Sequence, residues 1–347
     1  VSLEKLGLDV SVVDALKFVN PVLDKVVTHG YENSAKYAPK TWGAMYKISS
    51  GKASKEELDI LIRRMIGNKM FSLTQEKKPD VIIATHPFPT AALMKYKEDG
   101  SLRIPIISLL TDYTVHPAYI QKDVDAYIVG DEDVGYLLRN AGIERSKIYP
   151  FGIPISDDFM NTDRVNTVKQ QLKLEDKFTV LLMGGSFGAG NMKKCLLELL
   201  NSDHDFQIVV VTGRDLSLKE HLEKLLYEIK PAKTVRILGF TRDMPQLLSI
   251  ADALVSKPGG LTTTEAIMKA VPLVIPYYIP GQEADNAAFL LNNGLALKTF
   301  KSYPLATLIE ILIDYPERRM EIVKRMESRR KFNASEKIAD LAMRLIE

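Results

Sequence analysis

One stretch organises this chain: Ser256-Lys-Pro-Gly-Gly-Leu-Thr-Thr-Thr-Glu-Ala266. It follows a short apolar run, Ala251 to Val255, and leads into a helix predicted over 262–270. Gly259 and Gly260 let the backbone approach a ligand, and the first N–H groups of a helix have no partner inside it. The pattern therefore predicts a binding site for a phosphate or diphosphate. A second interpretation stays open, because Thr262 and Glu265 have the spacing of a capping box that only closes the helix start.

The bulk properties set limits on the fold and its partners. A length of 347 residues predicts two domains. The net charge of +2 predicts no large surface for nucleic acid. A single cysteine, Cys195, rules out an internal disulfide framework and a cysteine-rich metal site, and it fits a reducing cytoplasm. The apolar runs are only strand-length, so we expect neither a transmembrane helix nor a signal peptide, and any contact with a membrane would be peripheral.

Strand-like and helix-like segments alternate along both halves of the chain. In the first half the strand-like runs are 8–13, 80–84, 104–110, 126–129 and 147–149, with helices at 87–97 and 131–140 among them. After a turn at 151–156 the strands are 178–183, 207–212, 235–238, 272–276 and 296–298, with helices at 191–200, 216–229, 244–250 and 285–293. From 304 onward the chain reads as helix. This order predicts an α/β protein with two doubly wound parallel-sheet domains, which bind ligands beyond the carboxyl ends of their strands, in a cleft between them.

Two further motifs follow predicted strands of the second half. Met183-Gly-Gly-Ser-Phe-Gly-Ala-Gly190 is rich in glycine, although it does not match a dinucleotide fingerprint and could be a simple tight turn. Pro280-Gly-Gln-Glu-Ala-Asp-Asn286 offers donors and acceptors that suit the hydroxyl groups of a sugar, or else an N-cap cluster. Both motifs are expected at the same edge of the sheet as the stretch from Ser256, so the three together favour a nucleotide site.

Along the chain, Gly239-Phe-Thr-Arg-Asp-Met244 lies between the glycine-rich turn and the stretch from Ser256. The order of all these motifs resembles glycosyltransferase family 28. Within that family the chain is most similar to the monogalactosyldiacylglycerol synthases and the processive diacylglycerol glucosyltransferases, over nearly its whole length. The resemblance implies the GT-B fold. It implies an N-terminal acceptor and membrane-facing domain over 1–152, a C-terminal UDP-sugar domain over 153–325, and helices over 326–347 that return to the first domain.

The resemblance also implies roles for residues of the second domain. The glycine turn, with Gly185, Ser186, Phe187 and Gly188, would face the diphosphate; Phe240 and Met244 would border the uracil, and Glu265 would hold the ribose hydroxyls. Gly259, Gly260, Leu261, Thr262 and Thr263 would face the phosphates, Gln282 and Glu283 would read the sugar, and Arg214, Lys257, Gly281 and Asn286 complete the donor-binding set.

The implied reaction is an inverting single displacement with UDP as the leaving group. A helix dipole and its N–H groups can stabilise charge on the β-phosphate, so we expect no metal and no cofactor. A general base must take the proton of the acceptor hydroxyl. Asp112 and His116 match the family's Thr-Asp…His-Pro segment, and His86 lies in a similar loop. Each of the two histidines could instead be structural.

The segment from 20 to 70 is expected to be mostly helical and carries interleaved aromatic and basic residues. Trp42, Tyr46, Lys47, Arg63 and Arg64 suit contact with an anionic membrane surface and its acceptor lipid. Packing in a core with solvated lysines is the alternative. The expected location is the cytoplasmic face of the cell membrane.

The sequence departs from the family pattern at its start. Relatives begin with a strand and a Gly-x-Gly-His turn, whereas this sequence starts at Val1 in a helix-like segment, and a protein that truly lacked the turn is expected to have little activity. The implied partners are UDP-glucose or UDP-galactose and diacylglycerol or glycosyl-diacylglycerol. A GT-B transferase for another lipid-linked acceptor, as in cell-wall synthesis, and a non-catalytic nucleotide-sugar binding protein remain as alternatives.

Overall fold

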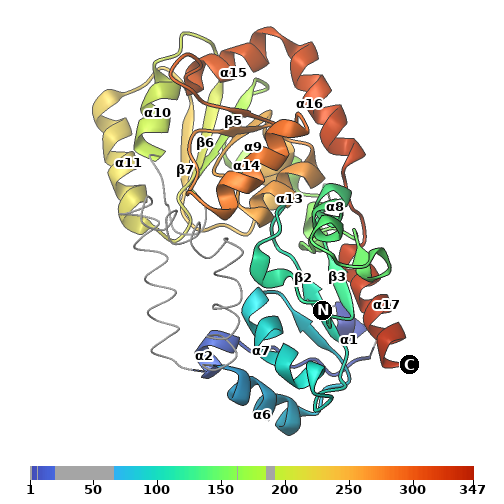
Figure 1. Cartoon of the computed structure of the whole chain (residues 1–347). Coiled ribbons are helices and arrows are strands. Elements are labelled where there is room, and N and C mark those ends of the chain that lie inside the picture. The colour runs from blue at the N-terminus through green and yellow to red at the C-terminus, as the bar shows by residue number, and fades with distance from the viewer. Residues whose placement is uncertain (1, 6, 20–65, 162, 185–191) are drawn as a thin grey trace. The chain divides into compact units, whose positions relative to one another are not determined.

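A computed structural model describes residues 2–5, 7–19, 66–161, 163–184 and 192–347 (Figure 1). The chain forms two compact units. The first comprises Val1–Pro154, Pro280–Gln282 and Lys331–Glu347, and the second comprises Ile155–Ile279 and Glu283–Arg330.

The first unit is built on a four-stranded parallel sheet. Its strand order is β1 (Ile82–Ala84), β2 (Ile106–Leu109), β3 (Ala126–Ile128) and β4 (Ile148–Tyr149). Its described helices are α1 (Ser2–Lys5), α2 (Ala15–Val19), α6 (Asn68–Lys77), α7 (Pro87–Glu98), α8 (Glu132–Asn140) and α17 (Ala334–Ile346), with short turns η2 (Pro117–Tyr119) and η3 (Arg145–Lys147). All four residues of β2 are buried, as expected for a strand covered on both faces.

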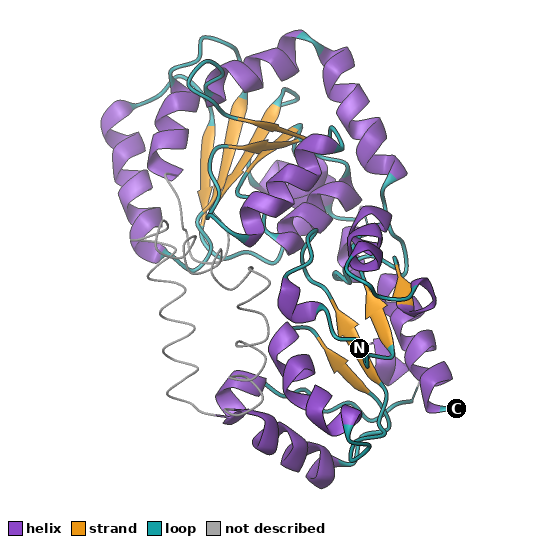
Figure 2. Ribbon diagram, viewed as in Figure 1, coloured by secondary structure: helices purple, strands orange, loops and turns teal. Residues whose placement is uncertain are grey.

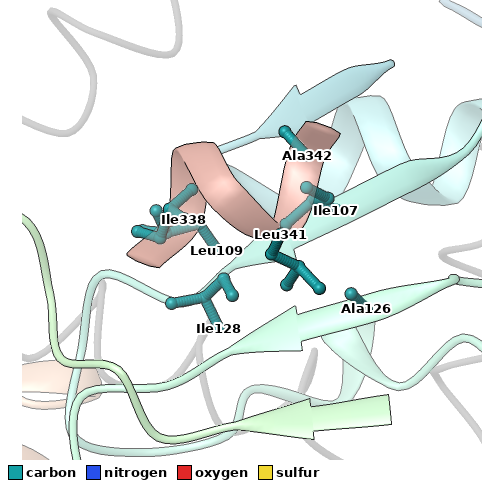
Figure 3. Close-up of a cluster of buried hydrophobic side chains, with 7 residues drawn as sticks. All are labelled: Ile107, Leu109, Ala126, Ile128, Ile338, Leu341 and Ala342. Carbon is teal, nitrogen blue, oxygen red and sulfur yellow. The ribbon is translucent and has the colours of Figure 1, made fainter. Parts of the chain in front are cut away.

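The C-terminal helix α17 supplies part of the core of this unit. Ile338, Leu341 and Ala342 pack against alternate residues of β2 and β3, as Figure 3 shows. The strand residues in this cluster are Ile107, Leu109, Ala126 and Ile128. Because side chains alternate across a strand, these four share one face of the sheet. The last helix therefore completes the core that the first half of the chain begins.

One predicted strand is wrong. Residues 8–13 form no strand, and Val12 is 93% exposed. The β-branched residues that suggested a strand favour an extended backbone, but a strand also needs a neighbour to pair with. Among the described residues, none pairs with this segment in a sheet.

The second unit contains a six-stranded parallel sheet with helices beside it (Figure 2). Its order is β10 (Ala296–Lys298), β9 (Leu273–Ile275), β8 (Ala253–Val255), β5 (Thr179–Met183), β6 (Gln207–Val211) and β7 (Val235–Leu238). The helices are α9 (Val165–Gln171), α10 (Met192–Leu200), α11 (Leu216–Ile229), α12 (Met244–Ile250), α13 (Gly260–Lys269), α14 (Gln282–Asn292), α15 (Leu305–Asp314) and α16 (Pro316–Ser328), after the turn η4 (Asp157–Phe159).

The strand order of the second unit contains a topological switch point. From β5 the chain adds β6 and β7 on one side, and then β8, β9 and β10 on the other. The carboxyl ends of the neighbouring strands β5 and β8 lie at this point, and open α/β sheets bind ligands at such a point. The predicted α/β class with parallel sheets is confirmed in both units.

None of the described helices is both long and apolar enough to cross a bilayer.

Candidate functional site

The glycine loop, residues 256–260, leaves β8 at the switch point and opens helix α13. Gly259 is the N-cap, with φ −68° and ψ 150°, and none of the described side chains caps this helix. The N–H of Gly259 donates to Lys257 O at 3.0 Å and that of Thr263 donates to Gly259 O at 2.8 Å. The N–H groups between them, at 260–262, are those that a helix start leaves for a ligand. A Cβ placed on Gly259 would meet nothing within 4 Å, so the space over the loop is open. This geometry fits an anion at a helix N-terminus.

The capping-box interpretation of this stretch is wrong. A capping box needs a serine or threonine at the N-cap, but here the N-cap is Gly259 and Thr262 lies inside the first turn of α13. The reason is that the helix begins at Gly260, two residues before the predicted start. Two hydroxyl groups of the same region, those of Ser256 and Thr263, are buried and have no hydrogen-bond partner among the described residues.

Glu265 lies in the second turn of α13 and is largely buried. Within the described parts of the chain, no side chain or backbone group forms a hydrogen bond or ion pair with its carboxyl group. Burial raises the pKa of Glu265 to about 7. A buried carboxyl without a partner is costly to ionise, and hydroxyl groups of a ligand that donate to it would offset that cost.

Lys257, Glu283 and Asn286, which we call the Lys257 cluster, join the glycine loop to α14. The ammonium group of Lys257 forms an ion pair with Oε1 of Glu283. Oε2 of Glu283 accepts a hydrogen bond from the N–H of Ile279 at 2.9 Å. Nδ2 of Asn286 donates to the carbonyl oxygen of Pro258 at 3.0 Å. The structure therefore brings these three predicted site residues together, but through contacts within the protein.

The entry to α14 depends on Gly281. Its φ of +117° lies in the region that favours glycine, and Gln282 follows as the first helical residue. Gln282 is half-buried. Along the chain, the turn thus connects the carboxyl end of β9 to the start of α14. That end of β9 adjoins the carboxyl end of β8.

Arg214 and Phe240 lie beyond the ends of β6 and β7. The guanidinium group of Arg214 lies over the Phe240 ring, 5.7 Å from its centre, and both side chains are exposed. Met244 opens α12 a few residues later. An exposed aromatic ring at this edge provides a flat surface on which a base can stack.

Some predicted site residues fall outside the described residues. These are Gly185, Ser186, Phe187 and Gly188 of the glycine turn, and Trp42, Tyr46, Lys47, Arg63 and Arg64 of the proposed membrane segment.

In the first unit, both candidate histidines cap helices. Nδ1 of His86 accepts from the N–H of Phe88 at 3.3 Å at the start of α7. Nδ1 of His116 accepts from the N–H of Ala118 at 3.2 Å at the start of η2. A neutral imidazole that accepts at Nδ1 carries its proton on Nε2. In this arrangement each histidine presents a donor, not a base.

The electrostatic surroundings of the three candidates agree with that assignment. His86 is partly in contact with solvent, but its ring is desolvated by the protein atoms around it. This desolvation, and then the nearby His116, lower the pKa of His86 to about 4. Asp112 is half-buried and lies near Tyr119, whose pKa is raised by burial and then by the Asp112 charge. Of the three, Asp112 is the group whose side chain, when ionised, has only acceptor atoms.

The first unit also contains a cavity of about 520 Å³ that the sequence did not reveal. It lies beside β1 and between α6, α7 and residues 11–15, with Thr85 and His86 on its wall. Its apolar lining includes Val12, Met70, Leu73, Ile83 and Leu93. No sequence signal could have located it, because its walls come from four separate segments. Among the described residues, no group of three His, Cys, Asp or Glu side chains is placed to hold a metal ion.

Family models match both halves of the chain. The model of monogalactosyldiacylglycerol (MGDG) synthase matches residues 3–155, and that of the glycosyltransferase family 28 C-terminal domain matches residues 179–345. The chain is 30% identical to the processive diacylglycerol beta-glucosyltransferase of Bacillus licheniformis, over 96% of this chain and 87% of that protein. It is 32% identical to the same enzyme of Staphylococcus haemolyticus, over 80% of this chain and 69% of that protein.

Solved structures with the same fold include two that are distant in sequence. HepE of Anabaena in complex with UDP has a TM-score of 0.57 and 16% identity, over 80% of this chain and 82% of that one. MurG of Acinetobacter baumannii has a TM-score of 0.58 and 18% identity, over 80% of this chain and 77% of that one. These likenesses establish the fold, which is GT-B. From its sequence relatives, the chain belongs to glycosyltransferase family 28, in the branch of the monogalactosyldiacylglycerol synthases and processive diacylglycerol glucosyltransferases.

Proposed function

We propose that this chain is an inverting glycosyltransferase that moves glucose from UDP-glucose to diacylglycerol. The observation that carries the proposal is the glycine loop at the switch point, with Glu265 largely buried and without a partner among the described residues one turn further along α13. A diphosphate fits the open helix N-terminus, and the two ribose hydroxyls fit a carboxyl group that lacks a partner. The names of the relatives support glucose as the sugar and diacylglycerol as the acceptor.

The residues of the second unit would hold the donor and stabilise the leaving group. Phe240 stacks on the uracil and Glu265 accepts from the ribose. The N–H groups at the start of α13 point at the phosphates, where the helix dipole favours negative charge. As the bond between the sugar C1 and the β-phosphate oxygen breaks, its electron pair stays on UDP, and these donors stabilise it. This stabilisation requires no metal.

Asp112 is our choice of general base. It takes the proton of the acceptor hydroxyl as that oxygen attacks C1 from the face opposite UDP, which inverts the configuration. His86 and His116 then act as donors through Nε2, because Nδ1 of each is used in a cap. Their role is to orient the acceptor or Asp112, not to remove the proton.

The base assignment leads to a direct comparison of two variants. Asp112→Asn should lower kcat by roughly 10²- to 10⁴-fold, the usual loss when a general base is removed. His116→Asn keeps a side-chain oxygen that can cap η2 and should lower kcat by less than about tenfold. The measurement is the steady-state rate with UDP-glucose and diacylglycerol in detergent micelles. A larger loss in His116→Asn than in Asp112→Asn would make the histidine the base.

The substrate assignment is tested with radiolabelled donors. The protein is incubated with UDP-glucose or UDP-galactose, with and without diacylglycerol and with and without EDTA. We expect a chloroform-soluble product from UDP-glucose that depends on diacylglycerol and survives EDTA. A product from UDP-galactose alone would change the sugar, and loss of product in EDTA would contradict the metal-independent mechanism. No lipid product with either donor would sink the proposal.

We also propose that the protein acts peripherally on the cytoplasmic face of the cell membrane. The support is the aromatic and basic composition of residues 20–70, together with a lipid acceptor. The protein should co-sediment with vesicles that contain an anionic lipid. Trp42→Ala with Lys47→Glu should weaken that binding and leave UDP affinity unchanged. Equal sedimentation of the variant and the parent would remove the segment from the membrane contact.

A further inference from the structure

The Lys257 cluster links the glycine loop to α14, and its side chains are largely buried. Glu283 is 7% exposed and Asn286 is fully buried. The carboxylate of Glu283 uses one oxygen for the Lys257 ammonium and the other for the Ile279 N–H. Both oxygens therefore already hold a donor from the protein before any sugar is present.

We propose that Glu283 is a positioning residue for the glycine loop and does not read the sugar. Glu283 holds the side chain of Lys257, which directly precedes Pro258 in the loop. Asn286 holds the Pro258 carbonyl oxygen. This inference rests on the proposed donor site, and it assigns the diphosphate as the part of the donor that Glu283 serves.

The geometry of one peptide unit explains the effect. The Pro258 carbonyl and the Gly259 N–H belong to the same planar group, so the hydrogen bond from Asn286 also sets the orientation of the Gly259 backbone. Gly259 is the N-cap from which α13 departs. A small rotation there would redirect the N–H groups that face the phosphates, and displacements of about 1 Å are costly for such sites.

The charges of the cluster point the same way. Lys257 is the basic residue of the glycine loop, but its ammonium is paired with Glu283. The pair is neutral as a unit, so the diphosphate is met by backbone N–H groups and the helix dipole. Loss of Glu283 would leave the largely buried Lys257 ammonium without its partner and would disturb the loop. Binding should then weaken even for a ligand that has no sugar.

The test is a double-mutant cycle measured with UDP and with UDP-glucose by calorimetry. The variants are Lys257→Met, Glu283→Leu, and both together. We expect each single variant to weaken UDP and UDP-glucose by the same factor, about tenfold, and the double variant to be no weaker than the worse single one. Glu283→Gln, which can still accept from the Ile279 N–H, should recover part of the loss.

Lys97→Met serves as the matched control. It breaks the Lys97–Asp125 ion pair (2.8 Å) of the first unit, whose lysine is similarly buried. It should lower the melting temperature without changing UDP affinity. Equal weakening of UDP binding by this control would overturn the proposal, because general destabilisation would then explain the effect.

Three other results would also overturn it. Glu283→Leu could weaken UDP-glucose and leave UDP unchanged, which would make Glu283 a sugar contact. The two single effects could multiply in the double variant, or the parent protein could bind no UDP. A parent that binds UDP with the expected cycle but makes no glycolipid would support the positioning role and sink the transferase function, so the two failures are distinguishable.

Discussion

Glu265 in α13 and Glu283 in α14 begin as similar residues and end in opposite states. Both lie within the first two turns of a helix that leaves the same edge of the second sheet. Glu283 holds a lysine and a backbone N–H, whereas Glu265 has no such partner among the described residues and its pKa rises to about 7. A carboxyl group whose needs are met inside the protein stabilises structure, and one whose needs are unmet is available to a ligand. Partners, not residue type, separate the two roles.

The largest expected effect is on ligand binding at the unpartnered glutamate. Glu265→Ala should weaken UDP by roughly 10²- to 10⁴-fold, the worth of two hydrogen bonds to a charged group at about 1.5–3 kcal/mol each. Calorimetry with UDP and 2′-deoxy-UDP measures it. The parent should discriminate between these two ligands and the variant should not. Equal UDP affinity in parent and variant would remove Glu265 from the site.

The next effect is on stability at the partnered glutamate. Glu283→Ala should lower the free energy of unfolding by about 3 kcal/mol, the lower end of the cost of leaving one charge of a buried pair alone, because Lys257 keeps some contact with water. Urea unfolding without ligand measures it, with Glu265→Ala as the matched variant. If Glu265→Ala is destabilised as much as Glu283→Ala, the contrast between the two residues is wrong.

The pH dependence of stability should follow Glu265. Its pKa is raised in the folded protein, from an ordinary 4.5 to about 7, so the folded state favours the protonated carboxyl. The contribution of Glu265 to the free energy of unfolding is fully present below pH 4.5 and is lost as the pH rises to about 7. With a discount for the exposed part of the side chain, it is on the order of 2 kcal/mol. UDP affinity should change in the opposite sense and fall below pH 7, since the ribose hydroxyls donate to the carboxylate. Glu265→Gln should flatten both profiles; an unchanged profile would contradict them.

The smallest effect concerns the start of α13. Since Gly259 is the N-cap, Thr262→Ala should change the unfolding free energy by less than about 0.5 kcal/mol, whereas removal of a true N-cap threonine costs about 1 kcal/mol. Urea unfolding without UDP measures the difference. A loss of about 1 kcal/mol or more would restore a capping role for Thr262 and weaken the case that Glu265 is kept for a ligand.

Much of the fold could be predicted because its signals are local. Helix α11 and strands β7 and β10 have the predicted bounds, since each is a clear apolar pattern closed by turn residues. The glycine loop and Glu265 were also predicted this way, because their signal is a short motif after a strand. The strand expected at 8–13 failed because pairing is not a local property.

The parts of the site that could not be predicted depend on contacts between distant segments or on hydrogen-bond direction. The sequence places Lys257 and Glu283 near one edge, but it does not say that they bind each other. The histidines in Thr-His-Pro and Val-His-Pro suggested bases, and only the structure shows that Nδ1 of His86 and of His116 accepts from the backbone. The cavity beside β1 has no motif at all.

The position of α17 has a consequence for biosynthesis. Ile338, Leu341 and Ala342 belong to the core of the first unit, but the ribosome makes them after nearly all of the second unit. During synthesis the second unit can fold as a largely continuous segment. Until α17 is made, the face of β2 and β3 that carries Ile107 and Ile128 lacks the side chains of that helix. Exposed apolar strands are prone to aggregate in this interval. The core of the first unit is therefore complete only after the second unit has been made, and we expect a chaperone that protects the nascent protein to bind that face.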